Sequence, residues 1–257
     1  MPLDALLAVV DRLRGEGGCP WDRAQDARSL LPYLVEETYE LVDAVERNDD
    51  QAQADEIGDL LYLVLLLVRI GTESGAFDLE RVERGIVAKM ERRHPGLFSR
   101  ADPAPGAAPM GSQEAWETHK AEERGDFRSA LEGLPPHLPA LLRAHRVAEK
   151  AARVGFDWPD RDGVLAKVDE ERRELDEALA STDPSAVRWE YGDLLLALAN
   201  LGRFLGVPGE DALREASRRF EIRFRALERL AAARGLDLHR TDLAVLERLW
   251  QEVKAVG

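Results

Sequence analysis

The chain has a single cysteine, Cys19, among its 257 residues, so no disulfide can form within it. It also lacks a long hydrophobic run, because the longest, LLYLVLLLV at 60–68, is too short to cross a bilayer as a helix. The N-terminal MPLDALLAVVDRL is amphipathic and carries Asp4 and Asp11, unlike a basic leader with an apolar centre. These absences predict a soluble cytoplasmic protein with no membrane partner.

Positive charge is scarce, because 35 Lys and Arg stand against 49 Asp and Glu, a formal net charge of -14. Phosphate backbones and anionic membranes are bound by an excess of cations, so we expect no nucleic-acid partner. Most of the acids are expected to solvate the faces of helices. A small phosphorylated ligand still fits this charge if a metal cation mediates its binding.

Common catalytic motifs are missing as well. The chain has no phosphate-binding loop of the form GxxxxGK followed by Ser or Thr, no GxSxG elbow and no Cys or His metal-ligand spacing. None of the five histidines falls in the acidic clusters described below. If the protein is a hydrolase, its nucleophile is therefore expected to be water.

Helical periodicity runs through nearly the whole chain. Apolar residues recur three and four positions apart, as in 30–45 and 165–179, and no stretch shows sustained strand alternation. The sequence predicts an all-α fold. Segments rich in Pro, Gly and Ala at 99–113 and 133–141 predict a linker and a second interruption. We place the boundary near Asp126, which gives two helical-bundle domains, 1–125 and 126–257.

Two hexapeptides are nearly identical, EIGDLL at 56–61 and EYGDLL at 190–195. A glycine inside a helix costs roughly 1 kcal/mol relative to alanine, so we expect Gly58 and Gly192 to allow close helix approach. The offset that carries position 56 to position 190 also joins two sets of acids: Glu36, Glu37, Glu40, Glu56 and Asp59, and Glu170, Glu171, Glu174, Glu190 and Asp193. This repetition indicates a duplication.

The spacing of the acids predicts which carboxylates meet. Residues three or four apart share a helix face, so Glu171 and Glu174 point the same way, as do Glu190 and Asp193 on the next helix. If these helices pack antiparallel, their carboxylates meet and require a divalent cation. Oxygen ligands suit Mg²⁺ or Mn²⁺, and Mg²⁺ usually keeps substrate phosphates as ligands. We predict this metal set, and a second one of Glu37, Glu40, Glu56 and Asp59.

The residues at this point resemble a known family. The pattern EExxE, a spacer and ExxD is similar to the signature of MazG-type nucleoside triphosphate pyrophosphohydrolases, in their tandem-domain bacterial form. Further stretches extend the resemblance over essentially the whole chain: GGCPWD at 17–22, LVEETYELVDAV at 34–45, ERRHPGLF at 91–98, VGFDW at 154–158 and LERLWQEVK at 246–254. The resemblance implies Mg²⁺-dependent hydrolysis of nucleoside triphosphates to monophosphate and pyrophosphate, with broad base tolerance, by a homodimer of intertwined helical bundles.

Comparison of the two halves favours the second as the main catalytic domain. At the offset of the duplication, Lys167 corresponds to Tyr33 and Asn200 to Leu66. Lys167 can meet a phosphate oxygen, and Asn200 can bond a sugar or base edge. The first half is then structural, regulatory or also active. As catalytic residues we take Glu171 and Glu174, with Glu170 lying behind the metal ligands or acting as a base.

The remaining substrate residues follow from the resemblance. Arg219 and Arg223 are expected to contact the triphosphate, and their first-half equivalents are Lys89 and Arg93 after a four-residue shortening of the loop. Trp250 and Lys254 belong to the nucleotide site in similar proteins. From the residues alone, Trp250 is more often a core or interface anchor than a base-stacking residue.

Two alternatives remain from the residues themselves. The chain could be a non-enzymatic helical dimer whose acidic seams bind divalent ions for structure or regulation. It could also hydrolyse a non-nucleotide diphosphate with the same metal chemistry. A panel of substrates separates these hypotheses.

Overall fold

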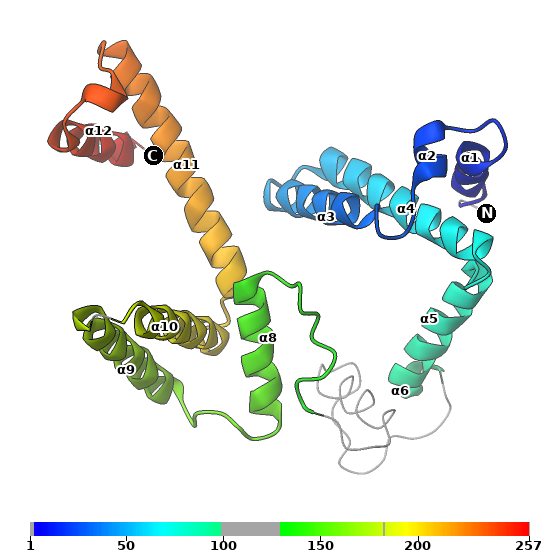
Figure 1. Cartoon of the computed structure of the whole chain (residues 1–257), viewed down its shortest axis with the longest axis horizontal. Coiled ribbons are helices and arrows are strands. Elements are labelled where there is room, and N and C mark those ends of the chain that lie inside the picture. Colours follow the sequence, from blue (N-terminus) through cyan, green and yellow to red (C-terminus); the bar gives the residue numbers. More distant parts are fainter. Residues whose placement is uncertain (1–2, 99–128, 182, 257) are drawn as a thin grey trace. The chain divides into compact units, whose positions relative to one another are not determined.

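A computed structural model describes residues 3–98, 129–181 and 183–256. Within these ranges every regular element is a helix, which confirms the predicted all-α class (Figure 1). Contacts divide the chain into two units, Met1–Gly125 and Asp126–Gly257, and each is described by itself. The expected linker at 99–113 lies outside the described residues. No helix in the described ranges is long and apolar enough to span a membrane.

The first unit is built on a pair of long helices. Helices α3, Leu31–Glu46, and α4, Asp50–Glu73, lie side by side and are joined by a tight turn (Figure 1). Asn48 takes a positive φ of 53° in this turn, and Asp49 caps α4 by accepting a hydrogen bond from the Ala52 amide. The other helices are α1, Asp4–Arg14; α2, Pro20–Ala24; α5, Leu79–Arg93; and α6, Pro95–Phe98.

The core of the first unit lies where α4 meets α1 and the residue before α3. Its buried side chains are Val10, Leu30, Leu63, Leu65 and Leu66. Beside this core, the buried Arg14 side chain donates to Glu73 and to backbone carbonyls of Asp22 and Gln25. These bonds tie α1 to the C-terminal end of α4 and to the segment around α2.

The second unit repeats the long helix pair. Helices α9, Arg161–Ala180, and α10, Pro184–Phe204, pack together, and α8, Ala140–Arg153, packs on α10 (Figure 1). Asp160 and Asp183 cap the two long helices through their side chains. A further pair consists of α11, Gly209–Ala233, and α12, Leu243–Val256, with a short 3₁₀ turn η1, Leu238–Arg240, between them. This pair buries Leu227, Ala231 and Leu249.

Matched helix ends accompany the matched motifs. Adding the offset of the duplication to the last residue of α3 gives the last residue of α9. Adding it to the first residue of α4 gives the first residue of α10. Adding the offset to the first residue of α5 gives a position four residues after the observed start of α11. This difference agrees with the four-residue shortening of the loop before α11. The repeated acids therefore occupy equivalent turns of equivalent helices in the two units.

The predicted role of the repeated glycines is wrong for this chain. Among the described residues, a Cβ atom added at Gly58 or Gly192 would meet no heavy atom within 4 Å, so neither glycine allows close approach of a neighbouring described helix. Both face open space because they lie off the face that packs against the partner helix. Gly163 does have a packing reason, since a Cβ there would lie 2.7 Å from the Trp158 ring.

Candidate metal and nucleotide site

Three carboxylates of the second unit converge between α9 and α10. Glu171 and Glu174 lie one turn apart on α9, Glu190 lies near the start of α10, and each offers an oxygen within 4.8 Å of the others. The arrangement follows from the sequence, because i and i+3 share a face and the short connection reverses the chain. Glu171 is buried and Glu174 is exposed, so the group opens from the helix seam to solvent.

A lysine already compensates part of this charge. The Lys167 ammonium lies 2.6 Å from a Glu171 oxygen and 2.8 Å from a Glu170 oxygen. The Lys167 bond lowers the pKa of Glu170 and holds it ionised. Lys167 lies one turn before Glu171 and is bound to these two carboxylates. A phosphate oxygen would have to compete with them for the ammonium.

Excess negative charge remains after this pairing. Desolvation, followed by the charge of Glu171, raises the pKa of Glu174, and the charges of Glu170 and Glu190 add to the shift while Lys167 opposes it. Three convergent oxygen donors without nitrogen or sulfur are the ligands that hard divalent cations prefer. The residues therefore fit the divalent cation expected from the sequence.

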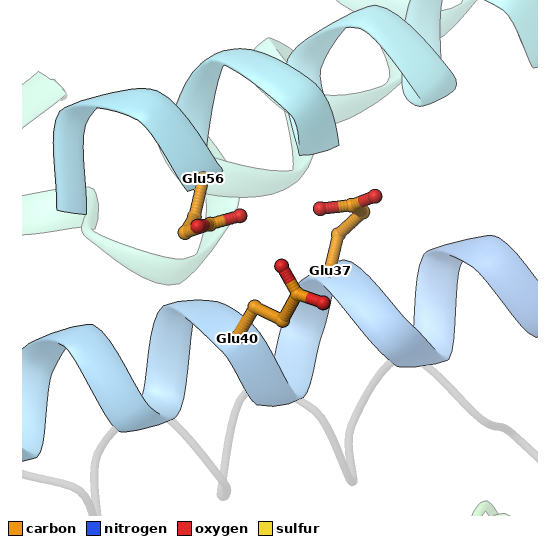
Figure 2. Close-up of side chains that lie close together, drawn as sticks. All are labelled: Glu37, Glu40 and Glu56. Carbon is orange, nitrogen blue, oxygen red and sulfur yellow. The ribbon is translucent and has the colours of Figure 1, made fainter. Parts of the chain in front are cut away.

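The first unit gathers an equivalent group. Figure 2 shows Glu37 and Glu40 on α3 directed toward Glu56 on α4, and their oxygens lie within 4.8 Å of one another. Desolvation raises the pKa of Glu37, and the neighbouring charges of Asp59, Glu40 and Glu56 raise it further. Tyr33 stands where the second unit has lysine, and its ring packs edge-on against Trp21 with centroids 5.4 Å apart. It supplies no positive charge.

The aspartates of the predicted sets lie apart from these groups of three. Neither Asp59 nor Asp193 belongs to the groups whose oxygens converge within 4.8 Å. Asp193 instead lines a cavity together with Glu171. Its predicted role as a metal ligand stays a prediction.

This cavity has a volume of about 200 Å³ and lies among α8, α9 and α10. It brings together Lys167 and Asn200, the two residues that distinguished the second half in the sequence. Sequence reasoning missed the rest of its wall. The missed residues are Val147, Ala148, Ala151, Phe156, Asp157, Leu196 and Ala197. Phe156 in VGFDW was the available signal, and Trp158 of the same stretch both lines the cavity and packs on Gly163.

The other predicted substrate residues lie on α11 and α12. Arg219 and Arg223 line a groove of about 580 Å³ between these helices, and Arg219 also pairs with Glu215. Trp250 packs against the α11–α12 core and lies 5.2 Å from the Phe220 ring, which favours its interpretation as an anchor. Lys254 lines neither the cavity nor the groove.

The fold and site define an all-α protein with two acidic helix seams that fit divalent cations. The chain belongs to the MazG family, because residues 25–98 match the MazG nucleotide pyrophosphohydrolase domain and two relatives match along nearly their whole length. This confirms the resemblance seen in the sequence.

Three relatives illustrate the similarity. The chain is 41% identical over 252 residues to the nucleoside triphosphate pyrophosphohydrolase/pyrophosphatase MazG of Thermotoga maritima, covering 98% of this chain and 95% of that protein. It is 42% identical over 262 residues to the nucleoside triphosphate pyrophosphohydrolase of Escherichia coli K12, covering 98% and 97%. It is 37% identical over 249 residues to the uncharacterized protein YabN of Bacillus subtilis, covering 96% of this chain and 50% of that protein.

Proposed function

We propose that this protein is a nucleoside triphosphate pyrophosphohydrolase, which converts nucleoside triphosphates to the monophosphate and pyrophosphate. The observation that carries this proposal is full-length similarity to two proteins named for that activity. The converging carboxylates at both helix seams agree with it, because carboxylates and the phosphates of a triphosphate can share a divalent cation as ligands. Clearing of the nucleotide pool is the role that we expect.

The cation is proposed to be Mg²⁺, with Mn²⁺ as a substitute. Glu171, Glu174, Glu190 and Asp193 are proposed to hold it in the second unit, and Glu37, Glu40, Glu56 and Asp59 in the first. When bound, such a cation neutralises phosphate charge and polarises the attacking water. The second unit is proposed as the main catalytic domain, since among the described residues its group is the one that includes a lysine, and this lysine can also meet phosphate.

Residues of the chain would carry out the proton transfer and the binding of phosphate and nucleoside. Glu170, ionised by its bond to Lys167, can accept a proton from water, although that bond must first loosen. Lys167 neutralises a phosphate oxygen when it leaves the carboxylates, and Asn200 binds the nucleoside in the adjoining cavity. Arg219, Arg223, Trp250 and Lys254 are proposed to complete the nucleotide site.

A homodimer is part of the proposal. Large apolar side chains are exposed on α10 and α11, among them Trp189, Leu198, Phe220, Ile222 and Phe224. A second copy of the chain would cover such faces and could place α11 and α12 against the acidic seam. Light scattering on the purified protein should give about twice the mass of one chain, and Leu198→Glu should lower that mass. A monomeric wild type would contradict dimerisation.

The activity is tested by product analysis. Purified protein is incubated with excess Mg²⁺ and a panel of ribo- and deoxyribonucleoside triphosphates, and phosphorus NMR separates pyrophosphate from orthophosphate. Monophosphate plus pyrophosphate, abolished by a chelator, is the expected result. Orthophosphate release would place the attack elsewhere on the triphosphate. Absence of turnover with every nucleotide would contradict the proposed function.

A further inference from the structure

The side chain of Asn200 is buried in the cavity wall, and its amide oxygen already accepts a hydrogen bond. Only 6% of the residue is exposed, and its Oδ1 accepts a hydrogen bond of 2.9 Å from Nε of Arg203. A guanidinium N–H only donates, so the atom that faces Arg203 must be the amide oxygen. The amide nitrogen, with its two donors, is therefore the group left for a ligand.

Two neighbours hold Arg203 in place. Its guanidinium forms an ion pair with Asp157, and its Cζ lies 4.5 Å from the centroid of the Phe204 ring. Asp157 lines the cavity and precedes α9, and Arg203 lies near the end of α10, so the contact joins the segment before α9 to the end of α10. Asp157 and Arg203 are positioning residues, because they fix which way the Asn200 amide is turned.

No hydrogen bond to the Asn200 amide nitrogen occurs within the part of the chain that the structure describes. The nitrogen is not one of the buried polar atoms that lack a partner among the described residues, so it can be reached from the cavity, and a ligand that supplies an acceptor at this point gains a hydrogen bond. A ligand that presents another donor there is disfavoured, since two N–H groups then oppose each other.

The rest of the cavity suits a flat aromatic group. Its wall is mainly apolar and includes Phe156, Trp158 and Leu196. Glu171 and Asp193 border the same cavity, and Asn200 follows Asp193 by two helical turns, about 10 Å along α10. A nucleotide whose phosphates lie at the carboxylates can therefore direct its base toward Asn200, with the edge far from the sugar entering first.

We propose that this cavity binds the nucleobase and that Asn200, turned by the Asp157–Arg203 pair, selects bases with a carbonyl oxygen on the edge far from the sugar. The proposal rests on the proposed function and specifies its substrate class. Guanine, hypoxanthine, uracil and thymine offer such an oxygen. Adenine and cytosine offer an amino group at the same position, and their nucleotides are hydrolysed less efficiently.

The test compares substrates that differ at this one position. Wild-type kcat/KM is measured for inosine against adenosine triphosphate and for uridine against cytidine triphosphate. We expect a preference of about tenfold or more for the oxo member of each pair, which corresponds to about 1.4 kcal/mol. Equal values for both pairs would overturn the proposal.

Variants test the positioning pair. In Arg203→Met the amide is free to turn, so the oxo preference should fall toward one. Asn200→Asp replaces the donors by an acceptor and should reverse the preference, although it keeps the side-chain shape. Arg240→Met is the matched control, because it removes another arginine paired to an aspartate, Asp237, on the surface. An unchanged preference in Arg203→Met would overturn the role of the pair.

A binding measurement separates failure of this proposal from failure of the proposed function. Titration calorimetry of wild-type protein with inosine and adenosine monophosphates reports base selection without turnover. Tighter binding of the inosine compound in an inactive protein would contradict the activity but support the base site. Hydrolysis of all nucleotides with equal binding of both monophosphates would support the activity and overturn the base selection.

Discussion

Replacing Lys167 by methionine should destabilise the second unit and make its stability more dependent on Mg²⁺. The variant keeps the aliphatic stem but removes the ammonium that lies 2.6 Å from the buried Glu171. Loss of one partner of a fully buried ion pair costs about 3–5 kcal/mol. The Lys167 side chain is 33% exposed, so screening by water reduces the expected loss to about 1–2 kcal/mol.

Thermal unfolding with a chelator and with Mg²⁺ measures the effect. Each kcal/mol lowers Tm by about 2–4 °C for a domain of this size, so the variant should melt roughly 5 °C lower without divalent ions. Saturating Mg²⁺ should recover most of that loss, because binding to the more negative site stabilises the folded state. Arg172→Met, which removes an exposed arginine paired with Asp176, is the control and should change Tm little. If Lys167→Met has the same Tm as the wild type with chelator present, then Lys167 does not stabilise the fold by neutralising the carboxylates of Glu170 and Glu171.

Other substitutions probe the two acidic seams, one ion pair and one repeated glycine. Glu171→Ala should abolish turnover while Glu37→Ala leaves most of it in the same pyrophosphate assay, and equal losses would contradict the ranking of the two units. Arg14 lowers the pKa of Glu73 below its usual 4.5, so this pair stabilises the fold above about pH 4.5 and its contribution is lost as the pH falls through the lowered value. In thermal unfolding at acid pH, Glu73→Gln should accordingly lose less stability on acidification than the wild type, and parallel pH curves would refute this. Gly192→Ala should raise stability by about 1 kcal/mol in thermal unfolding, because the added methyl meets no atom within 4 Å in the described part of the chain, and destabilisation would show that something else occupies that space.

Helix class and the acidic groups could be predicted from the sequence because both depend on local spacing. Acids three apart on one helix, followed by a short connection, bring Glu171, Glu174 and Glu190 together without any knowledge of distant contacts. Lys167 was predicted to meet a phosphate oxygen, and the sequence did not indicate that this lysine would bind the acids themselves.

The cavity wall could not be predicted because it depends on how α8 packs against α10. Nothing in the periodicity of α8 says which of its small residues, Ala148 and Ala151 among them, will face a ligand and which a helix. The glycine prediction failed for a related reason, since repetition at Gly58 and Gly192 shows that the residue was duplicated but not what surrounds it. Arg203 and Asn200 lie three apart on α10, but the ion pair of Arg203 with Asp157 joins α10 to the segment before α9, which spacing alone does not bring together.

The single ammonium of Lys167 lies where two kinds of negatively charged partner can bind it. It can neutralise the carboxylates of Glu170 and Glu171 or a phosphate of the substrate, but not both fully at once. Nucleotide and divalent cation should therefore bind with positive cooperativity, and thermodynamic linkage requires that each increases affinity for the other by the same factor. Titrating either ligand at fixed concentrations of the other measures that factor, and Lys167→Met should lower it.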